Sequence, residues 1–184
     1  MTGRTRAELY SRYPLSSVLI YQGSTILHFL LGGFGIILGY GYTWIGYLCG
    51  ALYLALAFGE MYVAMPLTVC PSCVYYRSKG SLCISGLNVV SRRVAEEGSH
   101  SGFSRRAEGL LCPNNLYMAA LVVPIVALIP ALVMNPSLLL LVVLLALVAL
   151  LLFRFFVIFS QIACVHCRAK FVCPQAGAMG VRDR

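Results

Sequence analysis

Six of the eight cysteines fall into two groups with the same short spacing, and thiolates at such spacing bind soft metal ions. The groups are Cys70, Cys73 and Cys83, and then Cys164, Cys167 and Cys173. Two residues between cysteines let one tight turn direct both sulfurs at a single ion while backbone amides point at the sulfurs. Because each group directly follows a long apolar run, the spacing predicts two copies of one metal-binding unit.

The spacing leaves the identity of the metal open. Six or seven sulfurs can serve one tetrahedral zinc, a two-zinc cluster, or one or two iron–sulfur clusters. Proline follows Cys70, Cys112 and Cys173, and a Cys-Pro dipeptide often ends a ferredoxin ligand run, although it also suits any tight turn. We therefore expect an iron–sulfur cluster, with zinc as the alternative. Three cysteines leave a four-iron cluster one ligand short, and Cys112, His166 or an exogenous ligand could complete it.

Other uses of the thiols remain open. On the reducing side of a membrane stable disulfides are rare, which favours metal binding. Reduced surface thiols or palmitoylation sites are the plain alternative for cysteines close to a membrane. A thiol–disulfide relay would also use Cys-x2-Cys pairs, but it would need them on the oxidising side. Cys49 lies within an apolar run and is expected to be a packing residue.

Four apolar runs position these cysteines, at residues 15–39, 43–69, 116–134 and 137–160. Each is close to or above the roughly 20 residues that cross a hydrocarbon core as a helix. A chain of 184 residues that is 60% hydrophobic and 11% charged cannot bury its apolar side chains in a core surrounded by water. The predicted fold class is an all-α membrane protein with four transmembrane helices in two tandem hairpins, each followed by a cytoplasmic cysteine knuckle.

The predicted organisation follows from these runs. It comprises an N-terminal segment (1–14), a first hairpin (15–69), a cysteine-containing loop (70–115), a second hairpin (116–160) and a cysteine-containing tail (161–184). The apolar run after residue 14 is too long for a signal-peptide core, so we expect the N-terminal segment to be retained. Tyr75 and Tyr76, at the start of the loop, are expected either to cover the cysteine site or to anchor the loop at the headgroup level, and anchoring is the commoner role of tyrosine there.

The positive charges predict the orientation. Of the 14 Lys and Arg residues, 13 lie before the first run, between the second and third, or after the fourth, and only Arg154 lies inside a run. Because Lys and Arg collect in cytoplasmic loops, both termini and the central loop are expected in the cytoplasm, with the protein in the inner (plasma) membrane. The net charge of +8 is thereby explained without a nucleic-acid partner.

Two charged residues fall inside the predicted spans. Glu60 precedes Cys70 by ten residues, and Arg154 precedes Cys164 by ten, so each lies roughly 15 Å from its cysteine pair along a helix. Charges within a span usually face the bundle interior or pair with one another, which predicts an intramembrane Glu60–Arg154 ion pair. Alternatively, Arg154 extends toward the cytoplasmic face and Glu60 is protonated or meets hydroxyl groups. His28, in the first run, is expected to be a hydrogen-bonded packing residue.

Several of these residues together resemble a family of short, uncharacterised four-helix membrane proteins of bacteria and archaea. The matching residues are Tyr13-Pro14-Leu15, Cys70-Pro71-Ser72-Cys73-Val74-Tyr75-Tyr76, Cys83, Gly86, Cys164-Val165-His166-Cys167 and Cys173-Pro174. The resemblance covers nearly the whole chain and implies four spans and a cysteine site, with no activity. Arg77 and Asn88 stand where the family pattern has glycine.

The function expected is that of a non-catalytic membrane subunit whose cysteines hold one or two metal centres, and which relays electrons or docks a membrane or cytoplasmic redox partner. It could form a homo- or hetero-oligomer. Two alternatives are a structural zinc site in a membrane anchor or assembly factor, and a protein that transports or senses a soft metal ion. No nucleophile, base and acid are grouped in the sequence, so an enzyme is not expected.

Overall fold

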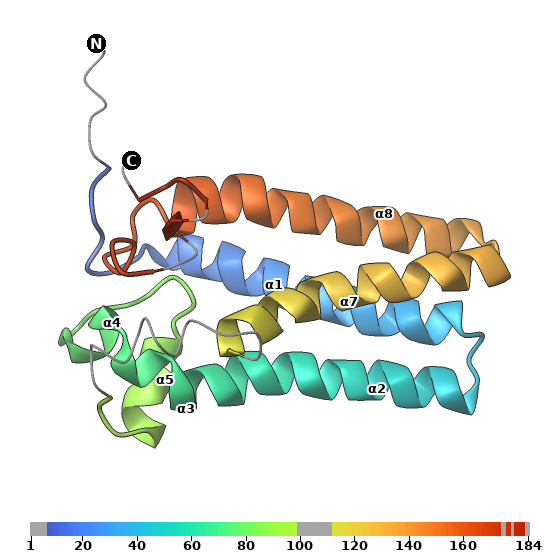
Figure 1. The fold of residues 1–184 in the computed structure, drawn as a ribbon, viewed down its shortest axis with the longest axis horizontal. Coiled ribbons are helices and arrows are strands. Elements are labelled where there is room, and N and C mark those ends of the chain that lie inside the picture. Colours follow the sequence, from blue (N-terminus) through green and yellow to red (C-terminus); the bar gives the residue numbers. More distant parts are fainter. Residues whose placement is uncertain (1–6, 99–111, 174–175, 178, 183–184) are drawn as a thin grey trace, which may run out of the picture.

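The computed structural model describes residues 7–98, 112–173, 176–177 and 179–182, and in these ranges the chain is mainly helical with no strand. Its long helices are α1 (Leu15–Gly39), α2 (Trp44–Gly59), α7 (Pro113–Met134) and α8 (Leu138–Phe153). Three short helices lie between α2 and α7, namely α3 (Met65–Thr68), α4 (Val74–Arg77) and α5 (Leu87–Val94). The long helices lie along one another, and α3, α4 and α5 gather at one end of the bundle (Figure 1).

Four helical stretches of the described chain are long and apolar enough to cross a membrane. They cover Leu15–Gly39, Trp44–Ser72, Pro113–Met134 and Leu138–Ala163. Their outer faces carry large apolar side chains such as Leu19, 70% exposed, Leu56, 65% exposed, and Leu145, 58% exposed. Such faces are stable against lipid and not against water. The predicted all-α protein with four candidate spans is thus confirmed, and a lipid bilayer is the environment that these faces suit.

Helix α1 is the central helix of the bundle. It packs against α2, α7 and α8. In its most apolar stretch 44% of the residues are buried, compared with 22% in the spans that contain α2 and α8. Small residues on α1 allow this close approach, because a Cβ atom at Gly32 would lie 2.9 Å from Cβ of Pro124 on α7. Glycine at such positions is how helices without a hydrophobic driving force between them pack tightly.

The second and fourth spans both change to π-helical geometry near the same end of the bundle. α2 continues into η1 (Glu60–Ala64), and α8 continues into η3 (Arg154–Ala163). Each π segment begins at the charged residue that precedes a cysteine pair by ten residues. A 3₁₀ turn, η2 (Cys70–Ser72), then ends the second span. Because π segments insert extra residues into a helix and are frequent at functional sites, this shared feature directs attention to the cysteine end.

The close approach at Gly32 can be tested against a glycine on the same helix that has free space around it. Gly32→Ala should lower the free energy of unfolding by about 1–3 kcal/mol, because the new methyl group meets Pro124 and Tyr53. Gly23→Ala should leave stability unchanged or raise it, since nothing lies within 4 Å of its Cβ position and alanine favours a helix. Thermal unfolding of both variants in lipid nanodiscs measures the difference, and equal effects would contradict the packing described.

Candidate functional site

The two Cys-x2-Cys segments form turns with the same backbone hydrogen bond. The N–H of Cys73 donates to the carbonyl of Cys70 at 3.1 Å, and the N–H of Cys167 donates to the carbonyl of Cys164 at 3.2 Å. The second cysteine of each pair also accepts at its own carbonyl, from Tyr76 at 2.9 Å in the first segment and from the residue three positions on at 3.1 Å in the second. Two segments 94 residues apart in the sequence therefore share one local fold.

An extended N-terminal strap, residues 8–13, joins the two cysteine segments. The N–H of Tyr10 donates to the carbonyl of His166 at 3.0 Å, and the N–H of Tyr13 donates to the carbonyl of Leu82 at 2.9 Å. These contacts form isolated parallel bridges, one at Cys167 and one beside Cys83. Because this one extended segment bonds to both regions, it fixes the second Cys-x2-Cys turn relative to the loop that carries Cys83.

Two buried tyrosines complete this junction. The hydroxyl of Tyr75, 2% exposed, donates to the carbonyl of Tyr10 at 2.7 Å and accepts from the N–H of Arg168 at 3.2 Å. The hydroxyl of Tyr13 donates to the carbonyl of Ala163, at the end of η3, at 2.5 Å. Tyr75 was expected to anchor the loop at the lipid headgroups. Instead it is buried, because its hydroxyl satisfies backbone groups of both the strap and the second cysteine segment.

Asn88 organises the loop around Cys83. Its side-chain oxygen accepts from the N–H of Cys83 at 3.1 Å, and its amide nitrogen donates to the carbonyls of Ser81 at 3.0 Å and Tyr75 at 3.2 Å. The side chain is 1% exposed, so all of these bonds are made away from water. A glycine at this position would supply none of them. The asparagine is therefore a structural feature of this chain.

Burial governs the electrostatics of the thiols. Mainly through burial, the pKa of Cys73 is raised to about 12; the backbone amide of Tyr75 opposes this rise, and the nearby Cys167 and Cys83 contribute to it. Burial likewise raises the pKa of Cys164 and of Cys167 to about 12, with Cys173 as a further cause in both. Thiols of both segments thus affect one another, and at neutral pH all three stay protonated.

The sulfur atoms are not gathered as a finished coordination shell. In the described part of the chain no three His, Cys, Asp or Glu side chains form a group that could hold a metal ion, and every cysteine is free. Cys70 and Cys164 pack against the apolar core, and Cys83 lies 3.4 Å from the hydroxyl of Ser85. Cys173 closes a backbone turn with Ala169, at 3.0 Å.

Cys112 and His166, the two residues suggested as an additional metal ligand, have structural partners instead. Cys112 is buried at the start of α7, where its sulfur accepts from the N–H of Asn115 at 3.3 Å. The ring of His166 stacks on Tyr10 with the centroids 4.4 Å apart, and its Nδ1 lies 2.8 Å from the carbonyl oxygen of Glu8. His166 thereby belongs to the attachment of the N-terminal strap, and neither residue lies in a group that could hold a metal ion within the described ranges.

The predicted Glu60–Arg154 ion pair is not formed. Arg154 is 1% exposed and donates to the hydroxyls of Ser24 at 3.0 Å, Thr25 at 2.5 Å and Tyr117. Its guanidinium carbon also lies 5.1 to 5.8 Å from the centroids of three aromatic rings, those of Tyr21, Tyr117 and Phe159. α8 packs on α1, which brings Arg154 to the hydroxyls of α1 and away from α2. Hydroxyl groups and aromatic faces therefore take the place of the predicted carboxylate.

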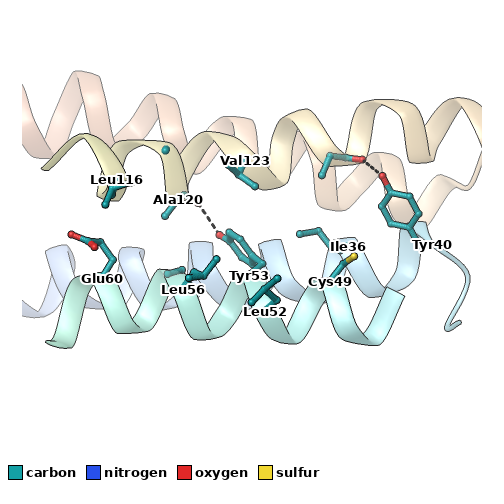
Figure 2. Close-up of a pocket in the computed structure, with 13 residues that line it drawn as sticks. Ile36, Tyr40, Cys49, Leu52, Tyr53, Leu56, Glu60, Leu116, Ala120 and Val123 are labelled. Carbon is teal, nitrogen blue, oxygen red and sulfur yellow. Dashed lines mark hydrogen bonds between the residues drawn. The ribbon is translucent and has the colours of Figure 1, made fainter. Parts of the chain in front are cut away.

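Glu60 lies in a different environment, at one end of an apolar groove of about 470 Å³ between α2 and α7 (Figure 2). Cys49 and Tyr40 line the other end of this groove. One carboxylate oxygen of Glu60 is enclosed and has no hydrogen-bond partner among the described residues. Glu60 is thus separate from both Arg154 and the cysteine turns. Cys49 is an exposed residue of α2 rather than the packing residue expected.

The residues missed at the sequence level are mostly hydroxyl-bearing and lie inside or beside the spans. Tyr13, Tyr21, Thr25 and Tyr117 are all buried and hold the two features described above, the N-terminal strap and Arg154. A signal was available, because a buried arginine in an apolar span needs polar partners and these residues interrupt otherwise apolar runs. His28 behaves as expected, with Nε2 2.9 Å from the carbonyl oxygen of Leu121.

Comparison with protein-family models, with curated proteins and with solved structures finds no match for this chain. The family resemblance seen in the sequence therefore stays a prediction, and function has to be argued from the residues themselves.

The junction at Tyr75 makes a testable prediction. Tyr75→Phe keeps the ring but removes the bonds to Tyr10 and Arg168, at a cost of about 1–3 kcal/mol for buried groups left unpaired. We expect Cys73 and Cys167 to react faster with a maleimide in nanodiscs, because the strap loosens. Tyr42→Phe, at the exposed far end of the bundle, is the matched control. Unchanged labelling in Tyr75→Phe would show that the hydroxyl does not hold the two segments together.

The raised thiol pKa values predict a loss of stability at alkaline pH. An unfolded chain releases its thiol protons near pH 8.5, whereas the buried thiols keep theirs to about pH 12. Their contribution is thus fully present below about pH 8.5 and is lost as the pH rises toward 12. Thermal midpoints of metal-free protein should fall across this window, and less steeply in Cys164→Ser/Cys167→Ser than in wild type. Cys49→Ser is the control, and identical slopes in all three proteins would contradict the assignment.

Proposed function

We propose that this chain is a membrane protein that binds a metal centre through the cysteines at one end of its helix bundle, and that the centre is an iron–sulfur cluster used for electron transfer or for docking a redox partner. The observation that carries the proposal is the pair of matching Cys-x2-Cys turns, of which residues 8–13 bond the second to the loop that follows the first. The thiol of Cys167 is near enough to that of Cys73 to raise its pKa, and paired thiols of this spacing are typical metal ligands.

The proposed arrangement is two tandem hairpins with their cysteine knuckles in the cytoplasm. It is supported by the positive charges at the end of the bundle where α3, α4 and α5 gather (Figure 1). Arg77 lies in α4, and Arg92 and Arg93 lie in α5. The opposite end, at residues 40–43 and 135–137, has no charged residue. That asymmetry favours cytoplasmic termini in an inner membrane.

The thiol side chains are chemically suited to a soft metal ion, but their sulfur atoms would have to move closer together to bind one. The donor set is rich in thiols, and the backbone amides of Tyr75 and Ala169 favour the thiolate forms of Cys73 and Cys167. Because these thiols are protonated at neutral pH, metal binding displaces their protons. A bound iron–sulfur cluster would supply one-electron chemistry. The chain itself positions the turns through the strap and through the hydroxyls of Tyr13 and Tyr75.

A structural zinc site is the second candidate, and a specific observation favours it. The strap and the Tyr75 hydroxyl already join the two segments without any metal. An added zinc ion would then only stabilise this existing junction, which is a structural role. Zinc carries no redox chemistry, so the protein would then be a membrane anchor or assembly factor. Elemental analysis separates the two candidates.

Metal content tests the proposal. Protein purified anaerobically in detergent should contain iron and acid-labile sulfide with broad visible absorbance, and Cys73→Ser/Cys167→Ser should lower metal affinity at least about tenfold, as even outer-shell changes do. Cys49→Ser, whose exposed thiol lies on α2, should retain the full content. Zinc without sulfide would replace electron transfer by the structural role. A chain that binds no metal at all under these conditions would refute both candidates.

A further inference from the structure

A half-open cavity of about 150 Å³ lies between the second cysteine turn and the aromatic residues around Arg154. Cys164 and Cys167 line it, together with the aromatic side chains of Tyr21, Tyr117 and Phe159. The same three rings surround the guanidinium of Arg154, at 5.1, 5.6 and 5.8 Å from its central carbon. The lining of the cavity therefore combines thiols with an aromatic wall, formed by Tyr21, Tyr117 and Phe159, whose rings also pack around the positive charge of Arg154.

The guanidinium group of Arg154 has no counterion in the described chain. Within these ranges an ion pair joins Arg77 to Glu97, outside the bundle, and the partners of Arg154 are hydroxyls and one carbonyl. A guanidinium group stays protonated in proteins, so this site carries a full positive charge. Burying a charge without a partner of opposite sign is costly, and a nearby anion would offset that cost.

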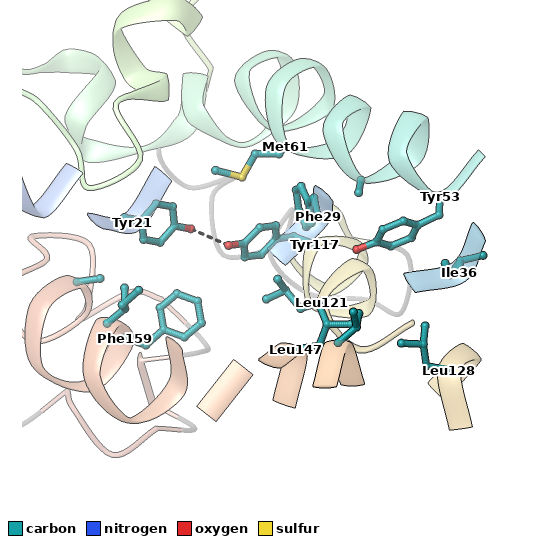
Figure 3. Close-up of a cluster of buried hydrophobic side chains, with 14 of the residues drawn as sticks. Tyr21, Phe29, Ile36, Tyr53, Met61, Tyr117, Leu121, Leu128, Leu147 and Phe159 are labelled. Atoms are coloured by element: carbon teal, nitrogen blue, oxygen red, sulfur yellow. Dashed lines mark hydrogen bonds between the residues drawn. The ribbon is translucent and has the colours of Figure 1, made fainter. Parts of the chain in front are cut away.

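The hydroxyls of Tyr21 and Tyr117 together have one hydrogen-bond donor that is not used within the described chain. Tyr21 and Tyr117 share one hydrogen bond, 3.3 Å between their hydroxyl oxygens (Figure 3), and Arg154 donates to the same oxygen of Tyr117. The arginine has no acceptor atom, so it takes neither phenolic proton. Only one of the two protons can be used in the bond between the tyrosines. The other has no acceptor among the described residues, although both side chains are more than nine-tenths buried.

The size and chemistry of the cavity define what would satisfy it. Since a water molecule has a share of about 30 Å³ in the liquid, the space suits a ligand of only a few atoms. The ligand has to accept a hydrogen bond and carry negative charge. The lining formed by the described residues contains no aspartate or glutamate that would repel an anion.

We propose that this cavity is a binding site for a small inorganic monoanion, such as a halide or hydrosulfide, held by the phenolic proton of the Tyr21–Tyr117 pair and by the positive charge of Arg154. The inference does not depend on a metal, since every residue that it uses is in place in the metal-free chain. Ordered water is the competing occupant, because it could also accept the spare proton. Water leaves the positive charge of Arg154 uncompensated, which is why the anion is favoured.

Iodide is the probe for this site. Metal-free wild-type protein in nanodiscs is heated at constant ionic strength while sodium iodide replaces sodium gluconate, whose anion is too large for the cavity. Binding to the folded state should raise the unfolding midpoint in a saturable way. Tyr117→Phe, which removes one hydroxyl of the pair, and Ala163→Leu, which fills part of the cavity, should each reduce this iodide-dependent shift at least fivefold.

Tyr53→Phe is the matched control, since its hydroxyl bonds to the carbonyl of Ala120 within the same bundle, at 2.9 Å and away from the cavity. It should keep the full iodide shift. The readout is the shift between the two salts rather than the midpoint itself, so a variant that is merely less stable still gives an answer. No shift in wild type, or shifts of equal size in Tyr117→Phe and Tyr53→Phe, would overturn the proposal. Because no metal is present, neither result bears on the cysteine centre.

Discussion

The cysteine end of this protein depends on a few hydrogen bonds made by residues 10 to 13. Their backbone groups bond to His166 on one side and to Leu82 on the other, and no other described segment makes backbone contacts to both cysteine-bearing regions. The apolar helices bring the two regions to the same end of the bundle, but lipid-facing helices can slide and tilt against one another. The strap, together with the hydroxyls of Tyr13 and Tyr75, turns that general proximity into a defined arrangement.

The π segments explain how two spans can deliver cysteines and charges in equivalent ways. In η3 the N–H of Cys164 donates to the carbonyl of Phe159, five residues earlier, at 2.9 Å. A wider turn rotates the side chains that follow it relative to a regular α-helix. Glu60 and Arg154 begin the two segments, so the change of geometry occurs at the same position of each half. The two spans thus share the starting position of the π segment, although η1 has 5 residues and η3 has 10.

Much of the fold followed from composition, while the contacts at the site did not. The apolar runs predicted four helices, because a span of hydrocarbon leaves few other ways to satisfy a backbone. The burial of Tyr75 could not be predicted, since a tyrosine next to a span is as suited to the headgroups as to a buried junction. Nor could the role of Asn88, whose partners Cys83, Ser81 and Tyr75 are brought together by loop geometry that has no periodic signal.

The failure of the predicted ion pair is the most informative of these differences. Glu60 and Arg154 each begin a π segment ten residues before a cysteine pair, but this shared spacing does not determine the direction in which a side chain points. α1 lies at the centre and packs on both α2 and α8, so residues at the same level of those two helices meet different neighbours. Arg154 meets the hydroxyls of Ser24 and Thr25, whereas Glu60 faces the groove beside α7. Had the two paired, the interior next to the thiols would be neutral. Because Glu60 and Arg154 are apart, no carboxylate of the described chain cancels the positive charge of Arg154 in the region next to the thiols. This charge stabilises any anionic species near Cys164, whether a bound ion or a metal–thiolate group.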